Sequence, residues 1–130
     1  MILGIGVDSI EIDRFVSWHS YSVKKLSRIF SPQEIDYCLS SQQKSAERFA
    51  TRFAAREALY KALSYAYPQK KIPFLTLCSH VSIITTDSRP YLIIQDSLGI
   101  DFDDVVVHLS LSHSSTVATA FVVIEQKQIV

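Results

Sequence analysis

The spacing of apolar and polar residues divides the chain into a helix-rich first part and a strand-rich second part. Residues 2–10 are mostly apolar, and Gly4 and Gly6 share one alternating face with Asp8. This pattern predicts a strand that has a bare patch and a carboxylate at its end. A helix is expected to begin near Asp13, which would cap it, and to turn these apolar side chains inward: Phe15, Val16, Val23, Leu26, Ile29 and Phe30.

Two more helices are predicted before the pattern changes. Ser31-Pro32-Gln33-Glu34 combines the capping-box spacing with a proline at the first helical position, so a short helix should start there. Residues 39–45 are typical of a loop. From Ala46 to Tyr67 the pattern predicts a long, alanine-rich helix that Pro68 ends.

After the long predicted helix, the spacing of apolar residues changes from a helical period to alternation at every second position. Runs rich in β-branched residues, separated by turn residues, predict antiparallel strands at 81–85, 91–95, 105–112 and 117–125. A leading strand, two or three helices and a strand-rich remainder indicate an α+β fold, in which an antiparallel sheet packs against the long central helix. We find no linker, so residues 1–130 are expected to form a single domain.

Composition and charge narrow the possible functions. The chain has 130 residues, 48 % of them hydrophobic and 20 % charged, which is the balance of a globular protein. The start of the chain lacks a basic leader and the ~18 apolar residues of a membrane span, so we expect a cytoplasmic protein without membrane contact. Cys38 and Cys78 are isolated and should be ordinary reduced thiols.

The zero net charge conceals an asymmetry. Residues 1–71 carry eleven Lys or Arg against seven Asp or Glu, and residues 72–130 carry two against six. Neutrality overall argues against a general nucleic-acid binder, whereas a basic half suits an acidic partner or a phosphorylated ligand. A solvated helical surface would give the same charge pattern.

Two charged residues lie in the middle of the apolar face of the long predicted helix. Glu57 and Lys61 are four residues apart, in the order that favours a helix-stabilising pair worth roughly 0.2–0.5 kcal/mol. Their neighbours on that face are phenylalanines and alanines, so both charges must lose water, which is costly unless a metal, a phosphate or the other charge compensates. A functional site and a buried structural pair both remain open.

A second acid could join them. Asp8 ends a strand that carries glycines, where a ligand can come close, and Mg²⁺ favours one or two carboxylates together with phosphate oxygens. The alternative is that Asp8 simply caps a turn.

Two further motifs suit phosphate binding. Arg48, Arg52 and Arg56 repeat every four residues along one edge of the helix, and guanidinium groups can each donate two hydrogen bonds to a phosphate. The alternative is a solvated stripe. In the segment from His108 to His113, Ser and His alternate with apolar residues, but this local spacing specifies no catalytic triad. A histidine at a strand end that binds a phosphate or a backbone group is the better interpretation.

In combination, three motifs resemble the holo-acyl-carrier-protein synthase family of 4′-phosphopantetheinyl transferases. They are Gly6-Val7-Asp8-Ser9-Ile10-Glu11 with Arg14, Arg52-Phe53-Ala54-Ala55-Arg56-Glu57-Ala58 with Lys61-Ala62, and Ser110-Leu111-Ser112-His113. Their order and spacing fit as well, and the match covers nearly the whole chain.

The resemblance implies a fold, a reaction and a set of roles. The fold would be that of the 4′-phosphopantetheinyl transferases. The reaction would be attack by a serine hydroxyl of apo acyl carrier protein on the β-phosphoryl group of coenzyme A, which releases adenosine 3′,5′-bisphosphate and supports fatty acid biosynthesis. The implied catalytic residues are Asp8, Glu57 and Lys61, and the first two would hold Mg²⁺. Such enzymes are typically homotrimers with active sites between subunits.

The remaining implied roles concern the two substrates. Arg52, Pro90 and His113 would bind coenzyme A, and Arg52 and His113 would lie near its 3′-phosphate. Arg14, Lys24 and Arg28 would meet the acidic helix of the carrier protein.

This chain departs from the family pattern at three places. Arg56 stands where Lys is frequent, the segment from Ser64 to Pro68 replaces a glycine-rich turn, and Ser88-Arg89-Pro90 replaces Gly-Lys-Pro. Two other functions compete with the transferase: a Mg²⁺-dependent phosphohydrolase that acts on coenzyme A or a nucleotide, and a binding module in which Glu57 and Lys61 form only a structural pair.

Overall fold

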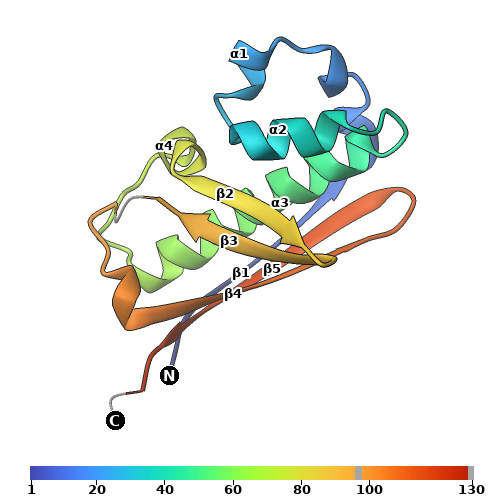
Figure 1. Ribbon diagram of the computed structural model, residues 1–130. Helices are drawn as coiled ribbons and strands as arrows, with labels where there is room; N and C mark the ends of the chain where they lie inside the picture. Colours follow the sequence, from blue (N-terminus) through green and yellow to red (C-terminus); the bar gives the residue numbers. More distant parts are fainter. Residues whose placement is uncertain (96–97, 129–130) are drawn as a thin grey trace.

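A long helix, α3, packs across one face of an antiparallel sheet of three strands (Figure 1). The computed structural model describes residues 1–95 and 98–128. Along the chain, its strands (β), α-helices (α) and 3₁₀ helices (η) are β1 (Ile2–Glu11), η1 (Ile12–Phe15), η2 (Trp18–Ser20), α1 (Val23–Leu26), α2 (Pro32–Leu39), α3 (Ser45–Ala66), α4 (Phe74–Ser79), β2 (Val81–Thr86), β3 (Arg89–Ile94), η3 (Phe102–Asp104), β4 (Val105–His113) and β5 (Val117–Gln126).

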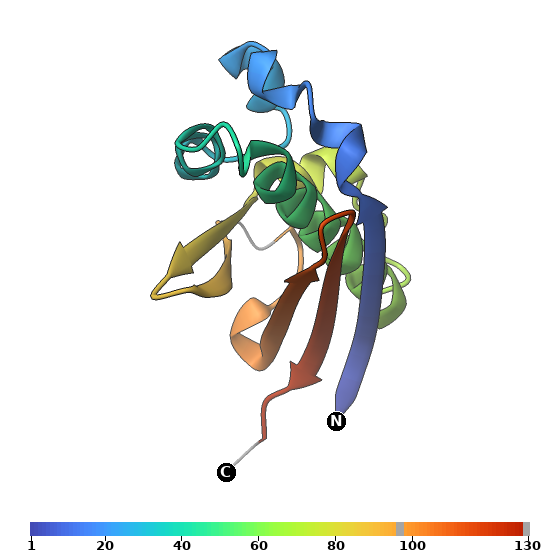
Figure 2. The same cartoon turned by 90° about the vertical axis from the view of Figure 1, so that its right-hand side faces the viewer.

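The strands form two sheets. β5 lies between β1 and β4 and is antiparallel to both, whereas β2 and β3 pair only with each other in the described part of the chain. Figure 2 shows the β2–β3 hairpin standing apart from the three-stranded sheet. The predicted α+β fold, with an antiparallel sheet against a long central helix, is confirmed, and the division into two sheets is an addition to it.

Glycine allows β1 to approach α3 closely. A Cβ atom at Gly6 would lie 2.0 Å from the carbonyl oxygen of Ala58, and one at Gly4 would lie 2.3 Å from that of Ala62. Since no side chain fits between strand and helix, the backbones touch directly. The bare patch predicted from the sequence is therefore the place where α3 crosses the strand.

The two faces of the three-stranded sheet differ. On the face toward α3, side chains of β5 are fully buried, and these are Ala118, Ala120, Val122 and Ile124. The opposite face, called here the outer face, carries apolar side chains that remain exposed, and these are Ile2, Ile5, Val7, Val106 and Phe121.

The predicted helix after Asp13 is wrong as a continuous element. The segment consists of two 3₁₀ turns and the four-residue helix α1, and Val16 and Val23 are exposed rather than buried. Polar side chains break it: Ser20 Oγ donates to the carbonyl of Ser17, and Ser22 Oγ accepts from the Lys25 amide and starts α1. Such side-chain contacts compete with helical hydrogen bonds.

The next two predicted helices are confirmed. At the start of α2, Ser31 accepts from the Glu34 amide and Glu34 accepts from the Ser31 amide, which completes the capping box. The observed bounds of α3 differ from the prediction by one residue at each end. Helix α4 was not predicted, because its six residues are too few to show a helical period. Among the described residues, no helix has both the length and the apolar character needed to cross a membrane.

Candidate functional site

Asp8, Glu57 and Lys61 come together where β1 crosses α3. The Lys61 Nζ atom lies 3.3 Å from Asp8 Oδ1 and donates to the carbonyl oxygen of Val7 at 3.0 Å. The Asp8 carboxylate is largely buried, whereas about half of the Lys61 side chain is exposed. The ammonium of Lys61 thus binds the strand, instead of forming the local helical pair with Glu57 that the four-residue spacing suggested.

Glu57 is a half-buried carboxylate, and its surroundings disfavour the charged form of its side chain. Burial raises the pKa of Glu57 above its ordinary value, and the negative charge of Asp8 raises it further. Lys61 and Arg14 act in the opposite direction and lower the pKa only in part. The charged form of Glu57 would therefore gain from an additional cation at this place.

The donor set fits Mg²⁺. The residues described include no group of three or more His, Cys, Asp or Glu side chains that could hold a metal by themselves. Two carboxylates with mutual repulsion are present instead, and Mg²⁺ is usually bound by one or two carboxylates, with water and substrate phosphates completing its shell. Asp8 and Glu57 would be the protein ligands of such an ion.

Arg56 has a different role from the one suggested by the three-arginine repeat. It is fully buried and forms a two-pronged ion pair with Glu34, with Nη1–Oε2 and Nη2–Oε1 distances of 2.7 and 2.5 Å. Its Nη2 atom also donates to the carbonyl of Val81 at 2.8 Å. The interpretation of Arg56 as a phosphate-binding residue is therefore wrong, because the pair with Glu34 joins α2 to α3 inside the core.

Arg48 and Arg52 lie on the side of α3 that faces α2. The Nη2 atom of Arg52 donates to Thr85 Oγ1 in β2 at 2.7 Å, and both guanidinium groups lie over the ring of Tyr37. Pro90 pairs with Thr85 in the β2–β3 hairpin. Two of the predicted coenzyme-binding residues, Arg52 and Pro90, are thus adjacent through Thr85.

His113 is held elsewhere. Its Nε2 atom lies 3.0 Å from Glu47 Oε1 in the first turn of α3, and its Nδ1 atom lies 3.3 Å from the carbonyl oxygen of Ser114. His113 therefore sits where the end of β4 meets the start of α3, and among the described residues no hydrogen bond or ion pair joins it to Arg52.

The three residues predicted to bind the carrier protein are exposed. Arg14 lies in η1, Lys24 in α1, and Arg28 two residues after the end of α1. Arg14 is also close enough to lower the pKa of Glu57, so this basic segment begins beside the acidic cluster.

The cysteines take no part in this site. Burial raises the pKa of Cys38 to about 12 and that of Cys78 to about 11. Both are free thiols, as predicted, and they stay protonated and unreactive at neutral pH.

Sequence reasoning missed Tyr37 and the second role of Glu34. The capping box identified Glu34 as a local helix signal, but its ion pair with Arg56 spans 22 positions and has no local signature. Tyr37 had no signal at all, because only the tertiary structure brings α2 against Arg48 and Arg52.

Comparisons with known proteins agree with this arrangement. A family model described as the 4′-phosphopantetheinyl transferase superfamily matches residues 4–122. Among curated relatives, the holo-[acyl-carrier-protein] synthase of Treponema denticola is 33 % identical, over 96 % of this chain and 99 % of that protein. The protein of the same name from Staphylococcus aureus is 35 % identical, over 97 % and 98 %.

Solved structures share the fold. A holo-(acyl-carrier-protein) synthase of Bacillus anthracis in complex with CoA (3′,5′-ADP) gives a TM-score of 0.73 at 32 % identity, with 98 % of this chain and 99 % of that chain covered. A Chronobacterium ammoniagenes ACPS–CoA complex gives 0.77 at 27 % identity, with 95 % and 97 % covered. The match spans both the β1 and the α3 halves of the site, and the chain therefore belongs to the 4′-phosphopantetheinyl transferase superfamily.

Proposed function

We propose that this protein transfers the 4′-phosphopantetheine group of coenzyme A to a serine of apo acyl carrier protein. The observation that carries the proposal is the meeting of Asp8, Glu57 and Lys61 at one point of a chain that belongs to this superfamily. Relatives named holo-[acyl-carrier-protein] synthase, and one solved in complex with coenzyme A, give the substrates. The proposed setting, fatty acid biosynthesis in the cytoplasm, follows from the family resemblance.

Asp8 and Glu57 are the proposed Mg²⁺ ligands. When bound, the ion neutralises charge on the pyrophosphate of coenzyme A. Lys61 extends from the same crossing point with half of its side chain in solvent, so its ammonium can donate to a phosphate oxygen while Asp8 holds it in place. Phosphoryl transfer depends mainly on positioning and charge stabilisation, and these residues supply both without forming a covalent intermediate.

Arg52, Pro90 and His113 are the proposed contacts for the nucleotide end of coenzyme A. Arg52 and Pro90 meet at Thr85. His113 lies beside the first turn of α3, where its Nε2 atom contacts Glu47. A phosphate could replace Glu47 as the partner of this nitrogen. Because the two locations are separate in one chain, an active site shared between subunits would accommodate both.

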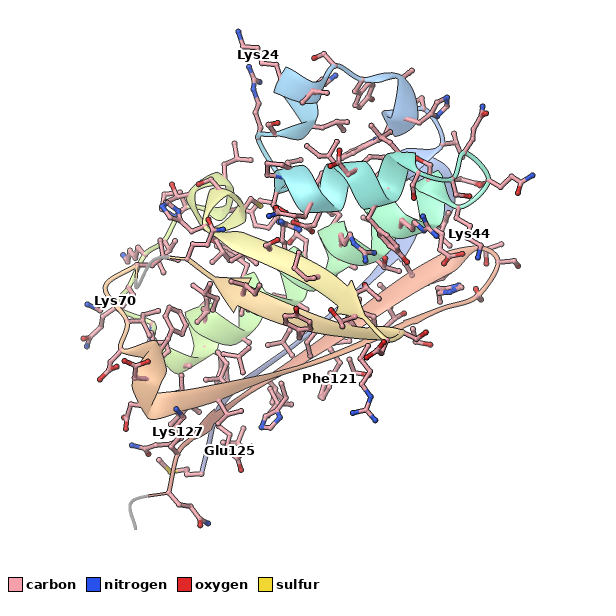
Figure 3. The ribbon with its side chains drawn as sticks, viewed as in Figure 1. Lys24, Lys44, Lys70, Phe121, Glu125 and Lys127 are labelled. Carbon is pink, nitrogen blue, oxygen red and sulfur yellow. The ribbon has the colours of Figure 1, made fainter. Side chains whose placement is uncertain are left out.

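The outer face of the sheet supports a homotrimer. Val7 lies opposite Phe121 in the register of β1 and β5, and both side chains are about half exposed although they are apolar. Figure 3 shows Phe121 on the side of the sheet away from α3. Contiguous apolar surface of this kind usually marks an interaction site.

This assembly has its own test. A charge at position 121 would have to be buried in the subunit interface, so Phe121→Lys should convert the trimer to monomer in light scattering after gel filtration. Phe121→Leu, which keeps the apolar contact, should remain trimeric. A wild-type protein that is monomeric at micromolar concentration would refute the trimer.

Arg14, Lys24 and Arg28 form the proposed docking surface for the carrier protein. They are exposed and cationic, and Arg14 lies beside Glu57, so a carrier bound to this segment would bring its serine toward the metal ligands. Electrostatic complementarity of this type chiefly affects the rate of association and should weaken with added salt.

Intact-protein mass spectrometry tests the reaction. Purified protein with Mg²⁺, coenzyme A and an apo carrier should add the mass of phosphopantetheine to the carrier and release adenosine 3′,5′-bisphosphate. Cleavage of coenzyme A without a change in carrier mass would show a phosphohydrolase instead. Binding of coenzyme A with neither change would leave only the binding module.

A further inference from the structure

Two arginines of α3 share one aromatic ring. The guanidinium carbons of Arg48 and Arg52 lie 4.0 and 4.5 Å from the centroid of the Tyr37 ring. Arg48 Nη1 also donates to the Tyr37 carbonyl at 2.8 Å and to Ser40 Oγ at 2.9 Å. The last turn of α2 therefore fixes the position of both cations.

These cations have no anionic partner within the described residues. The hydrogen-bond acceptors of Arg48 and Arg52 are neutral carbonyl and hydroxyl groups, and neither arginine forms an ion pair there. The carboxylate of Glu34 lies nearby, but both of its oxygens bind Arg56. Because Arg52 is only 4 % exposed, its charge is both desolvated and uncompensated.

Hydrogen-bond donors remain for a ligand. Arg52 uses three N–H donors, on Arg48 O, Thr51 Oγ1 and Thr85 Oγ1, and its buried Nε atom has no partner. An arginine has five such donors. A hollow of about 100 Å³ adjoins this group, lined in part by Tyr37, Arg52 and Thr85. A hollow needs about 10–15 Å³ by this measure to hold one water, so this one has room for a group the size of a phosphate.

We propose that Tyr37 is a positioning residue that sets Arg48 and Arg52 as a two-pronged site for a terminal phosphate monoester. Cations four residues apart on a helix repel each other, and the negative face of one ring attracts both. The proposal rests on the proposed function, in which the monoester is the 3′-phosphate of coenzyme A. It adds Arg48 as a second phosphate donor and makes selectivity for that phosphate depend on a residue of α2.

Substitution of Tyr37 tests the proposal through substrate selectivity. The expected result for Tyr37→Leu is a rise of about tenfold in KM for coenzyme A with kcat unchanged, and no change in KM for dephospho-coenzyme A, which lacks the 3′-phosphate. Tyr37→Phe keeps the ring and should retain the wild-type KM values. An equal rise for both coenzymes, or no rise for either, would overturn the proposal.

Direct binding separates this proposal from the transfer reaction. In isothermal titration, adenosine 3′,5′-bisphosphate should bind more tightly than adenosine 5′-monophosphate, and both Tyr37→Leu and Arg48→Gln should reduce the difference. If the carrier is never modified but this difference persists and depends on Tyr37, the transfer reaction fails and the phosphate site stands. If the two nucleotides bind the wild type equally, the phosphate site fails whatever the reaction is. Because Tyr37 is 38 % exposed, its substitution should leave the thermal midpoint nearly unchanged.

Discussion

Arg56 and Glu57 are consecutive residues of α3, but their side chains have opposite electrostatic surroundings: the charge of Arg56 is paired with an opposite charge, and Glu57 lies near a like charge. Arg56 points toward α2 and is fully buried, and both prongs of its guanidinium group meet the carboxylate of Glu34. Glu57 points toward β1, where burial raises its pKa and a second carboxylate, that of Asp8, raises it further. One charge is compensated by the fold and the other is not.

The difference separates a structural role from a functional one. A compensated pair such as Glu34–Arg56 keeps the packing of α2 on α3 specific and leaves no donor set for a ligand. Two carboxylates that repel each other destabilise the folded chain, and such an arrangement persists where a ligand cation offsets it. Substitutions at these adjacent positions should therefore have effects that differ in kind.

The largest expected effect is on stability, at Arg56. Arg56→Met leaves the Glu34 carboxylate buried without its partner, so we expect the free energy of unfolding in urea to fall by about 3–5 kcal/mol. The double variant Glu34→Leu/Arg56→Met removes both charges and should recover a large part of this loss. A double variant as unstable as the single one would show that packing, and not the unpaired charge, causes the loss.

The next effect concerns turnover, at Glu57. Glu57→Gln removes a proposed metal ligand without changing the shape of the side chain, and we expect kcat to fall by about 100-fold or more in protein that remains folded. Asp36→Asn, an exposed acid of α2, is the matched control and should keep wild-type activity. Turnover that survives in Glu57→Gln would exclude Glu57 from the metal site.

A smaller effect is expected at the contact that brings the two carboxylates together. In Gly6→Ala the new methyl group would lie 2.0 Å from the Ala58 carbonyl oxygen, so strand and helix must separate. We expect a loss of about 1–3 kcal/mol in the free energy of unfolding, together with reduced activity, because Asp8 moves with the strand. Reduced stability with unchanged kcat would show that the position of Asp8 tolerates this shift.

The smallest effect is the pH dependence of stability. Because the pKa of Glu57 is raised in the folded state, the folded protein holds this proton more tightly than the unfolded chain does, and stability is lost as pH rises above the unfolded value of 4.5. In urea titrations without Mg²⁺, Glu57→Gln should therefore gain stability relative to wild type as pH rises through this range. A variant less stable than wild type at neutral pH would instead indicate that Glu57 belongs to a structural pair.

Much of the fold could be predicted from local patterns. The capping box of α2 and the bounds of α3 follow from consecutive residues, and the structure confirms the first and gives the second within one residue. The prediction that Glu57 and Lys61 lie in the middle of the buried face is wrong, because that face includes Arg52 and Arg56, whereas Glu57 is half-buried and Lys61 is exposed. The continuous helix after Asp13 was wrong because the side chains of Ser20 and Ser22 form hydrogen bonds with nearby backbone groups, which the spacing of apolar residues does not reveal. The separation of the β2–β3 hairpin from the other strands depends on long-range pairing.

The candidate site divides in the same way. Glu57 and Lys61 were identified because charges on an apolar helical face are anomalous, and the glycines of β1 indicated a close approach beside Asp8. The partner of Lys61 could not be predicted, since the ammonium reaches another element. The three arginines of the repeat do not share one role. Arg56 points into the core, whereas Arg48 and Arg52 lie over the ring of Tyr37, which only the tertiary structure brings next to them.

The junction between β1 and α3 is built from residues that have no rotamers. Gly4 and Gly6 face Ala58 and Ala62 across it, and each of these positions is buried. Glycine and alanine lose no side-chain entropy on folding, and they also have no torsion angles through which a displaced neighbour could be accommodated. Direct contact between the main chains of β1 and α3 therefore fixes the distance between the backbone positions of Asp8 and Glu57. Adjustment to a bound ion is left to the two carboxylate side chains alone.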